Sequence, residues 1–337
     1  MPIHAGFLPG LYASVAVLAL QACALTTGLL GLGTKEKSTQ IAATCAPGLE
    51  QRPLARWTTI SGNLRVRSLP AAGASDRLNR VQLISPVAVA AQASDVYIAD
   101  VGHRTVFKYD RGTETVRVFV AVPNMNTLTR LYVDRAFSLY VVDPAAAEVV
   151  QYDIDGRPLQ TFRNSTELPR PVAAVVDDGR GEVLVGDALS ARILVFNRGG
   201  LVAQAIGAAV GEGAHFQSIV GMALGTDQLY VVDRAGRQVF ALAGDGAFRY
   251  TFGSEDLVLP GAIALDGFNR VFVADNGDST IKVYRGGALE AVVGASGDPA
   301  GLRFNEISDL WASDGLLYVA DPARASVEVL RIEPPCE

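Results

Sequence analysis

The stretch Val96-Tyr-Ile-Ala-Asp100 is a short apolar run that closes on an aspartate, and the chain repeats this pattern five more times. The other copies are Leu139-Tyr-Val-Val-Asp143, Val183-Leu-Val-Gly-Asp187, Leu229-Tyr-Val-Val-Asp233, Val271-Phe-Val-Ala-Asp275 and Leu317-Tyr-Val-Ala-Asp321. Successive closing aspartates lie 43, 44, 46, 42 and 46 residues apart. A period in the forties with several short strands per unit is typical of the blades of a β-propeller.

Each unit carries four strand-like runs in the same order. In the first unit an apolar run, Pro86–Ala90, precedes the run that ends on Asp100, and the alternating run Val106–Tyr109 follows it. Hairpin signals such as Asp155-Gly156 and Gly286-Gly287 separate the third run from the fourth. We therefore predict an all-β fold, a six-bladed β-propeller with four-stranded antiparallel blades.

Residues 82–332 resemble the NHL-repeat family, in its bacterial exported or lipoprotein form. Two linkers carry the family's glycines followed by phenylalanine, and two turns carry a shortened form of its Asp-x-Gly-x-x-Arg motif. These segments are Gly207–Gly211–Gly213–Phe216, Gly294–Gly297–Phe304, Asp100-Val-Gly-His-Arg104 and Asp233-Arg-Ala-Gly-Arg237. The resemblance implies the same six-bladed fold.

The sixth unit lacks an outer strand, because Val327–Leu330 is followed by Glu333-Pro-Pro-Cys336. An unpaired sheet edge is a liability. The spare β-rich segments lie near the other terminus, at Trp57–Ile60 and Leu64–Arg67. We expect one of these two segments to complete the last blade.

The N-terminal segment has the features of a targeting sequence. No Asp, Glu, Lys or Arg occurs through Thr34, and Phe7–Leu20 supplies an apolar core. The following Leu20-Gln-Ala-Cys23 resembles a bacterial lipobox, in which the cysteine is lipidated. We expect a signal peptide over 1–22, a tether over 23–54 and the propeller over 55–337, with the protein exported and anchored on the periplasmic or cell-surface side of the envelope.

Two alternatives stay open for this segment. No basic residue precedes the apolar core, and the apolar run resumes as far as Leu32. A helix of about 20 apolar residues can span a bilayer, so an uncleaved anchor is one alternative. Lys35 and Lys37 would then place the body on the cytoplasmic side. A freely secreted form is the other alternative.

The remaining two cysteines, Cys45 and Cys336, lie just outside the two ends of the ring. Exported proteins favour disulfides, so we expect these cysteines to form one. The alternative is two unrelated thiols.

One face of the ring is the expected binding surface. The connections between units and those after the second strand share this face, including the long segments 62–84, 207–218 and 294–306. We call it the long-loop face, and we expect a ligand at its channel mouth. Its candidate residues are Asp100, His103, Arg104, Asp143, Asp187, Arg192, His215, Asp233, Arg237, Asp275, Asn276, Asp321 and Arg324.

The aspartates and histidines each allow a functional and a structural interpretation, and the structural one for His103 is a variant of the family's Asn-His-Arg turn. The six carboxylates could form a ring for a metal or a cation, or each could accept hydrogen bonds from its own turn, as in an Asx-turn. Some six-bladed relatives, such as the peptidylglycine amidating lyases, use histidines around zinc. His103 and His215 belong to units about three blades apart and could share a metal only at the axis. We assign no metal site, cofactor or catalytic residue.

The composition restricts the partner. The net charge is −6 and no basic block occurs in the body, so a nucleic acid is not expected. The leading hypothesis is a membrane-tethered binding or scaffold propeller that recognises a protein, peptide or glycan of the envelope. A metal-dependent lyase or a lactonase-like enzyme with its site at the channel mouth is the alternative, and a structural role in an envelope assembly is a third.

Overall fold

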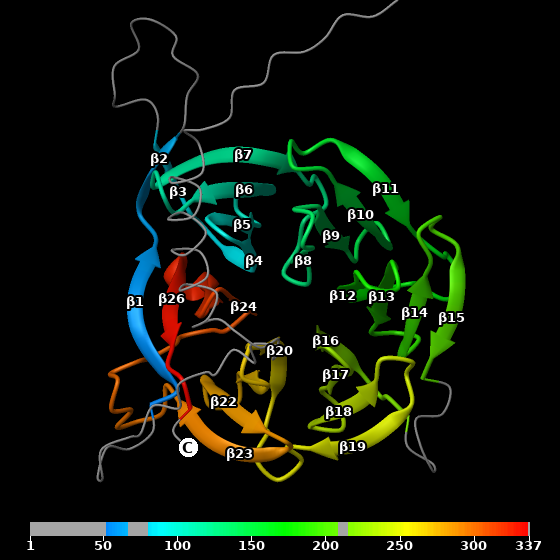
Figure 1. The fold of residues 1–337 in the computed structure, drawn as a ribbon. Helices are drawn as coiled ribbons and strands as arrows, with labels where there is room; N and C mark the ends of the chain where they lie inside the picture. Colours follow the sequence, from blue (N-terminus) through cyan, green and yellow to red (C-terminus); the bar gives the residue numbers. More distant parts are fainter. Residues whose placement is uncertain (1–51, 67–79, 208–214, 336–337) are drawn as a thin grey trace, which may run out of the picture. The chain divides into compact units, whose positions relative to one another are not determined.

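The computed structural model describes residues 52–66, 80–207 and 215–335, which form a six-bladed β-propeller (Figure 1). The predicted fold class is therefore confirmed. The expected signal peptide, most of the tether and the three cysteines Cys23, Cys45 and Cys336 lie outside the described residues, so the predictions made for them stay predictions. Within the described part of the chain, no helix has the length and apolar character needed to cross a membrane.

In blades two to five the first strand in sequence lies nearest the axis and the last lies outermost. The first three blades contain β4 (Pro86–Gln92), β5 (Asp95–Asp100), β6 (Thr105–Asp110), β7 (Thr115–Ala121), β8 (Arg130–Val133), β9 (Leu139–Asp143), β10 (Glu148–Tyr152), β11 (Pro158–Phe162), β12 (Pro171–Asp177), β13 (Glu182–Asp187), β14 (Arg192–Phe196) and β15 (Val202–Ile206). The last three contain β16 (Ile219–Leu224), β17 (Gln228–Asp233), β18 (Gln238–Ala243), β19 (Phe248–Phe252), β20 (Pro260–Leu265), β21 (Arg270–Asp275), β22 (Thr280–Arg285), β23 (Ala288–Val293), β24 (Asp309–Ser313), β25 (Leu316–Asp321), the 3-10 turn η2 (Pro322–Arg324) and β26 (Ser326–Ile332).

Burial falls from the axis to the rim of each blade. The first six residues of β4 are buried, as are the last five of β5, because neighbouring blades cover both faces of these strands. Strands that are covered on both faces are apolar without a gap. In the outer strand β15, by contrast, the first four residues are exposed and only Ile206 is buried.

The core of the described ring is divided into six layers, one between each pair of neighbouring blades. One of them joins the sixth blade to the first and includes Val89, Ile98 and Tyr318. Another joins the fifth blade to the sixth and includes Phe272 and Leu330. Each blade is therefore stabilised from both sides, and the packing continues across the junction of the two chain ends.

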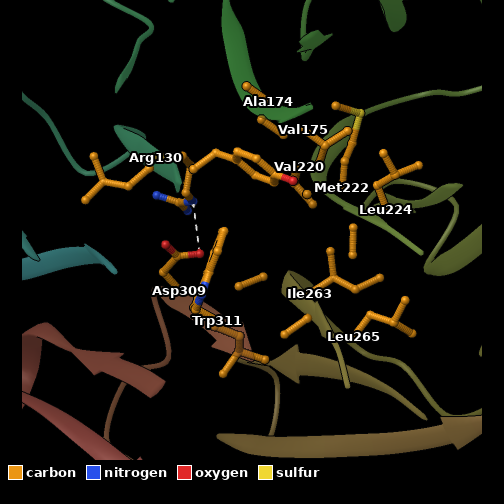
Figure 2. Close-up of a pocket in the computed structure, with 18 of the residues that line it drawn as sticks. Arg130, Ala174, Val175, Val220, Met222, Leu224, Ile263, Leu265, Asp309 and Trp311 are labelled. Carbon is orange, nitrogen blue, oxygen red and sulfur yellow. Dashed lines mark ion pairs between the residues drawn. The ribbon is translucent and has the colours of Figure 1, made fainter. Parts of the chain in front are cut away.

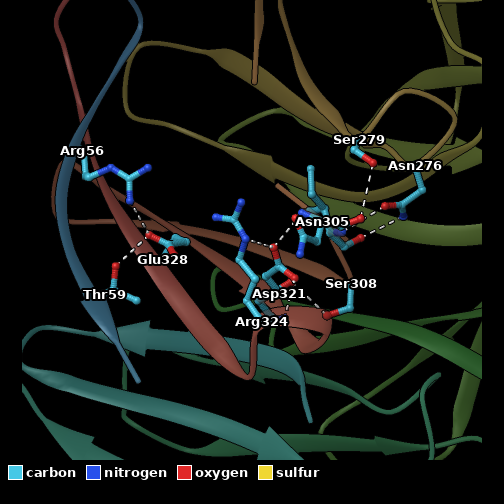
Figure 3. A network of polar contacts seen from close by, with 11 residues as sticks. Arg56, Thr59, Asn276, Ser279, Asn305, Ser308, Asp321, Arg324 and Glu328 are labelled. Atoms are coloured by element: carbon cyan, nitrogen blue, oxygen red, sulfur yellow. Dashed lines mark hydrogen bonds and ion pairs between the residues drawn. The ribbon is translucent and has the colours of Figure 1, made fainter. Parts of the chain in front are cut away.

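The ring is closed by β1 (Leu54–Ile60), which pairs antiparallel with β26 from Leu54 opposite Ile332 to Ile60 opposite Val327. This confirms the prediction that an N-terminal strand completes the last blade. A polar contact accompanies the pairing, because the buried Glu328 accepts hydrogen bonds from Thr59 Oγ1 at 2.8 Å and from Arg56 Nη1 at 3.3 Å (Figure 3).

The second segment considered for ring closure, which begins at Leu64, pairs with the first blade and not with the last. It forms β2 (Asn63–Val66), which pairs in parallel with the outer strand β7 of the first blade. The short strand β3 (Arg80–Gln82) then pairs antiparallel with β2. The first blade therefore has six strands, whereas the sequence predicted four in every blade.

Two residues of β1 test how far the closing strand stabilises the ring. Leu54 is buried against the core layer that contains Leu330, whereas Trp57 is 59% exposed. We expect Leu54→Ala to lower the free energy of unfolding by about 2–5 kcal/mol, since it removes buried methyl groups and leaves a cavity. Trp57→Ala should change it by less than about 1 kcal/mol. Urea unfolding measures both, and equal losses would contradict this account of the closure.

Candidate binding site at the mouth of the central channel

The six closing aspartates are buried, and their carboxylates accept hydrogen bonds from backbone N–H groups. Asp100 accepts from His103 N in its own turn at 3.1 Å and from Ile84 N, in the segment that enters the blade, at 2.7 Å. The same double contact is made by Asp187, Asp233, Asp275 and Asp321. Asp143 accepts from N–H groups of its own turn. These bonds agree with the Asx-turn interpretation of the repeat.

In every blade, the residue four positions after the closing aspartate has a backbone conformation in the left-handed region. These residues are Arg104, Ala147, Ala191, Arg237, Ser279 and Ala325, with φ between 49° and 56°. Side chains with a Cβ adopt this conformation at a cost of roughly 1–2 kcal/mol. The candidate residues Arg104 and Arg237 therefore occupy a position that the turn itself requires in every blade.

The glycine of the Asp-x-Gly turns leaves room for the entering segment. A Cβ on Gly102 would lie 2.4 Å from the Cβ of Ile84, and one on Gly277 would lie 2.6 Å from the Cβ of Val258. In both blades the entering segment packs directly on the turn.

Three other candidate residues make polar contacts, and those of Asn276 and Arg324 are drawn in Figure 3. Arg324 lies 3.6 Å from the carboxylate of Asp321 in its own blade. The side-chain amide of Asn276 donates to Ile307 O at 2.9 Å and accepts from Ile307 N at 3.0 Å, which joins the fifth blade to the sixth. Arg192 lies 3.7 Å from Glu167.

The two histidines lie in separate parts of the ring. His103 belongs to the first blade, where its Nδ1 lies 3.2 Å from Asp100 Oδ1 and its ring meets Phe107 edge-on. His215 is exposed in the segment that enters the fourth blade. No group of three or more His, Cys, Asp or Glu side chains is placed to hold a metal ion in the described ranges.

The channel along the axis contains a cavity of about 180 Å³. It is lined by the inner strands of blades two to six, namely β8, β12, β16, β20 and β24 (Figure 2). Most of the lining is apolar, with Val175, Met222, Leu224, Ile263 and Leu265 facing the space. A pocket that is mostly apolar and carries a few polar groups is the usual form of a small-molecule site.

The sixfold repeat is broken at two inner strands. β8 begins with Arg130-Leu-Tyr132 and β24 begins with Asp309-Leu-Trp311, whereas the other four inner strands begin with uncharged residues. These two strands lie on either side of β4 (Figure 1). Arg130 Nε lies 3.9 Å from Asp309 Oδ1, and the rings of Tyr132 and Trp311 meet edge-on at 5.3 Å (Figure 2).

The side chains of β24 also bond to the backbone of β4. Asp309 Oδ2 accepts from Val89 N at 3.0 Å, and Trp311 Nε1 donates to Ala91 O at 2.7 Å. None of the described residues of β4 lines the cavity, which is bounded by the other five blades. The small side chains of β4, such as Ala88 and Ala90, leave room for the side chains of β8 and β24 to lie between β4 and the cavity.

A second guanidinium lies at the same end of the channel. Arg234 follows Asp233 at the end of β17, and its Nε donates to Pro260 O, at the start of β20, at 3.0 Å. Burial lowers the pKa of Arg234, and the positive charge of Arg130 lowers it further. The two cations are therefore close enough to repel each other.

Burial raises the pKa of Asp309 to about 6, although the Arg130 guanidinium and the N–H groups of Val89 and Leu310 oppose this rise. The carboxyl thus changes its charge close to neutral pH. Arg130 is held by other contacts, because its Nη1 donates to Thr129 O at 2.8 Å and to Thr127 O at 3.1 Å.

Solved structures share this fold. A streptogramin B lyase is 10% identical with a TM-score of 0.58, covering 82% of this chain and 98% of its own. The virginiamycin B lyase of Staphylococcus aureus is 9% identical with a TM-score of 0.55, covering 74% and 96%. A Bacteroides thetaiotaomicron protein of unknown function is 13% identical with a TM-score of 0.61, covering 82% and 75%. The likeness is one of fold. No family model and no curated protein matches the chain.

Sequence reasoning missed the residues that converge at the channel mouth. The candidates it named belong to the repeated turns, which are spread around the ring, whereas Arg130, Arg234, Asp309, Tyr132 and Trp311 are absent from that set. A signal for four of them was present, because β8 and β24 both begin with a charged residue, a leucine and an aromatic residue. This departure from the other inner strands could have been found by aligning the six units.

The raised pKa of Asp309 has a consequence for stability. Well below pH 3.8 both the folded and the unfolded chain hold the proton, and the stability that the raised pKa contributes is lost as the pH rises from there through 6. Asp309→Asn keeps an acceptor for Val89 N but carries no charge. The free energy of unfolding of Asp309→Asn, minus that of the parent protein, is the quantity compared. We expect this difference to be about 2 kcal/mol larger at pH 7.5 than at pH 4.5.

Urea unfolding at the two pH values measures this difference. Asp227→Asn, at a carboxylate whose side chain is 75% exposed, is the control. A gain for Asp309→Asn that is the same at both pH values would contradict the assigned burial of the charge.

Proposed function

We propose that this protein is an exported, membrane-tethered propeller of the NHL-repeat type that binds a ligand at the mouth of its central channel, on the long-loop face. One observation carries the proposal: the repeat is broken where Arg130 and Asp309 pair beside an apolar cavity, and Arg234 lies at the same end of the channel, at the start of β20. Charged groups are costly in an apolar channel, so their place at its entrance suits recognition of a ligand.

The surface around the mouth supports a macromolecular ligand. Exposed apolar side chains lie on the turns and entering segments of the long-loop face, at Ile84, Leu128, Leu189, Val258 and Leu259. Apolar groups beside polar ones are common in protein interfaces. We propose a protein, peptide or glycan of the cell envelope as the partner, and the net charge of −6 argues against a nucleic acid.

The attachment to the membrane rests on the N-terminal sequence. The apolar segment that ends in Leu20-Gln-Ala-Cys23 supports a lipid anchor at Cys23, and we propose a disulfide between Cys45 and Cys336. The body would then face the periplasm or the cell exterior.

A lyase is the second candidate. Two of the proteins that share this fold are named as streptogramin B and virginiamycin B lyases. Asp309, with its pKa raised to about 6, is suited to proton transfer near neutral pH. Incubation with virginiamycin B, with and without added zinc or calcium, separates the candidates by mass spectrometry. Intact substrate supports the binding function, whereas conversion that is lost in Asp309→Asn would establish the lyase.

A photo-crosslinking experiment tests the proposed face. Leu189 and Leu201 belong to the same blade and are 61% and 69% exposed, but Leu189 lies in the turn on the long-loop face and Leu201 lies in the hairpin at the opposite face. With p-benzoylphenylalanine at each position in cells, we expect a covalent adduct at position 189 and none at 201. The adduct is measured as a mass shift of the purified protein. Adducts at 201 alone, or at neither position, would overturn the proposal.

A further inference from the structure

The channel mouth carries more positive than negative charge. Arg130 lies 3.9 Å from the carboxylate of Asp309, and a second guanidinium, that of Arg234, bonds to Pro260 O at the start of β20, close enough for the charge of Arg130 to act on it. The side chain of Arg130 is 16% exposed and that of Asp309 is 11% exposed, so solvent screens this charge only weakly. A partly buried excess of cations favours an anionic ligand.

The carboxylate of Asp309 does not neutralise either cation fully. Its distance of 3.9 Å from Arg130 Nε is too long for a hydrogen bond, and its Oδ2 is engaged by Val89 N. Arg234 uses its Nε for Pro260 O, and no described residue accepts a hydrogen bond from its two Nη atoms. A Cβ at Gly261 would lie 3.6 Å from Arg234 Nη2, so the guanidinium lies against the start of the inner strand β20.

The space below these cations is suited to one apolar group. The cavity of about 180 Å³ is lined by aliphatic side chains and by two aromatic residues, Tyr132 and Trp311. The polar atoms of the aromatic pair point away into the walls, because Tyr132 Oη donates to Val176 O and Trp311 Nε1 donates to Ala91 O. An apolar protein cavity of roughly 150 Å³ is large enough to bind benzene. A single ring is therefore the size that this space accommodates.

We propose that the channel mouth binds a small carboxylate with one apolar ring, the carboxylate between Arg130 and Arg234 and the ring in the cavity between Trp311 and Met222. This inference rests on the proposed binding function and names the chemistry of its ligand, either a free aryl carboxylate or the carboxylate terminus of a peptide that ends in an aromatic residue. A planar carboxylate accepts two hydrogen bonds from a guanidinium. Two guanidiniums and one ionised carboxylate carry a net charge of +1, which a monoanion neutralises.

The channel tryptophan makes binding directly measurable. The chain has two tryptophans, and Trp57 lies on the outer strand β1, so Trp57→Phe leaves Trp311 as the only tryptophan, which is excited selectively at the red edge of the absorption band. In this background we would titrate phenylacetate, the isosteric neutral phenylacetamide, acetate, inorganic phosphate and the dipeptide Gly-Phe. We expect saturable quenching by phenylacetate, with at least about tenfold weaker binding of phenylacetamide and of acetate. A response to Gly-Phe that is stronger than that to phenylacetate would identify the peptide terminus as the source.

Variants test the role of the cation. Arg234→Met should weaken phenylacetate binding at least about tenfold and leave phenylacetamide unaffected, and Arg234→Lys should restore part of the loss. Arg249→Met, at an arginine of the outer strand β19 that lies 3.5 Å from Asp227, is the control and should bind as the parent does. Circular dichroism and the melting temperature show whether each variant is folded.

Three results would overturn the inference. Equal binding of phenylacetate and phenylacetamide would show that the anion is not recognised, and stronger binding of phosphate than of phenylacetate would show that the ring is not. The absence of any saturable response would also overturn it. The proposed binding function is judged separately, by the adduct at position 189.

Discussion

The ring depends on the hydrogen bonds between the buried closing aspartates and the backbone around them. Each of five carboxylates bonds to N–H groups of its own turn and to N–H groups of the segment that enters the blade. A buried N–H group without a partner is costly, and hydrogen bonds to a charged acceptor are the stronger ones. The aspartate therefore sets where the chain enters the inner strand, and a period of about 44 residues follows from repeating this contact once per blade.

A scaffold that repeats six times yields a channel that is nearly the same on all sides, so recognition requires a departure from the repeat. In this protein the departure lies in the inner strands on either side of the first blade. Arg130 with Tyr132 and Asp309 with Trp311 meet across β4 and cover it, which leaves a cavity between the other five blades. The same contacts place a carboxyl with a pKa of about 6 and two guanidiniums at one end of the channel. Charge, an aromatic wall and an apolar space thus come together at one place.

The parts of the fold that follow a local pattern were predictable, and those that depend on pairing across the molecule were less so. Two segments qualified as the closing strand, and only their pairing partners distinguish them: Leu54–Ile60 joins β26, whereas Asn63–Val66 joins β7 in parallel. Both are short and rich in β-branched or alternating residues, so composition alone could not separate them. The extra strands of the first blade were missed for the same reason, because their partner lies about 50 residues away in sequence.

The sequence by itself determined the number of blades, the order of strands within the repeating unit and the face that carries the turns, because these follow from a periodic apolar pattern that closes on an aspartate in each unit. It also showed that the uncharged N-terminal segment ends before Lys35 and that spare β-rich segments lie near the start of the chain. The tertiary structure decided which residues meet at the axis. Arg130, Arg234 and Asp309 belong to the second, fourth and sixth blades, and only closing the ring brings their charges to the same end of the channel. Side chains from different blades converge at the axis because every inner strand runs along it, and this proximity has no counterpart in sequence distance.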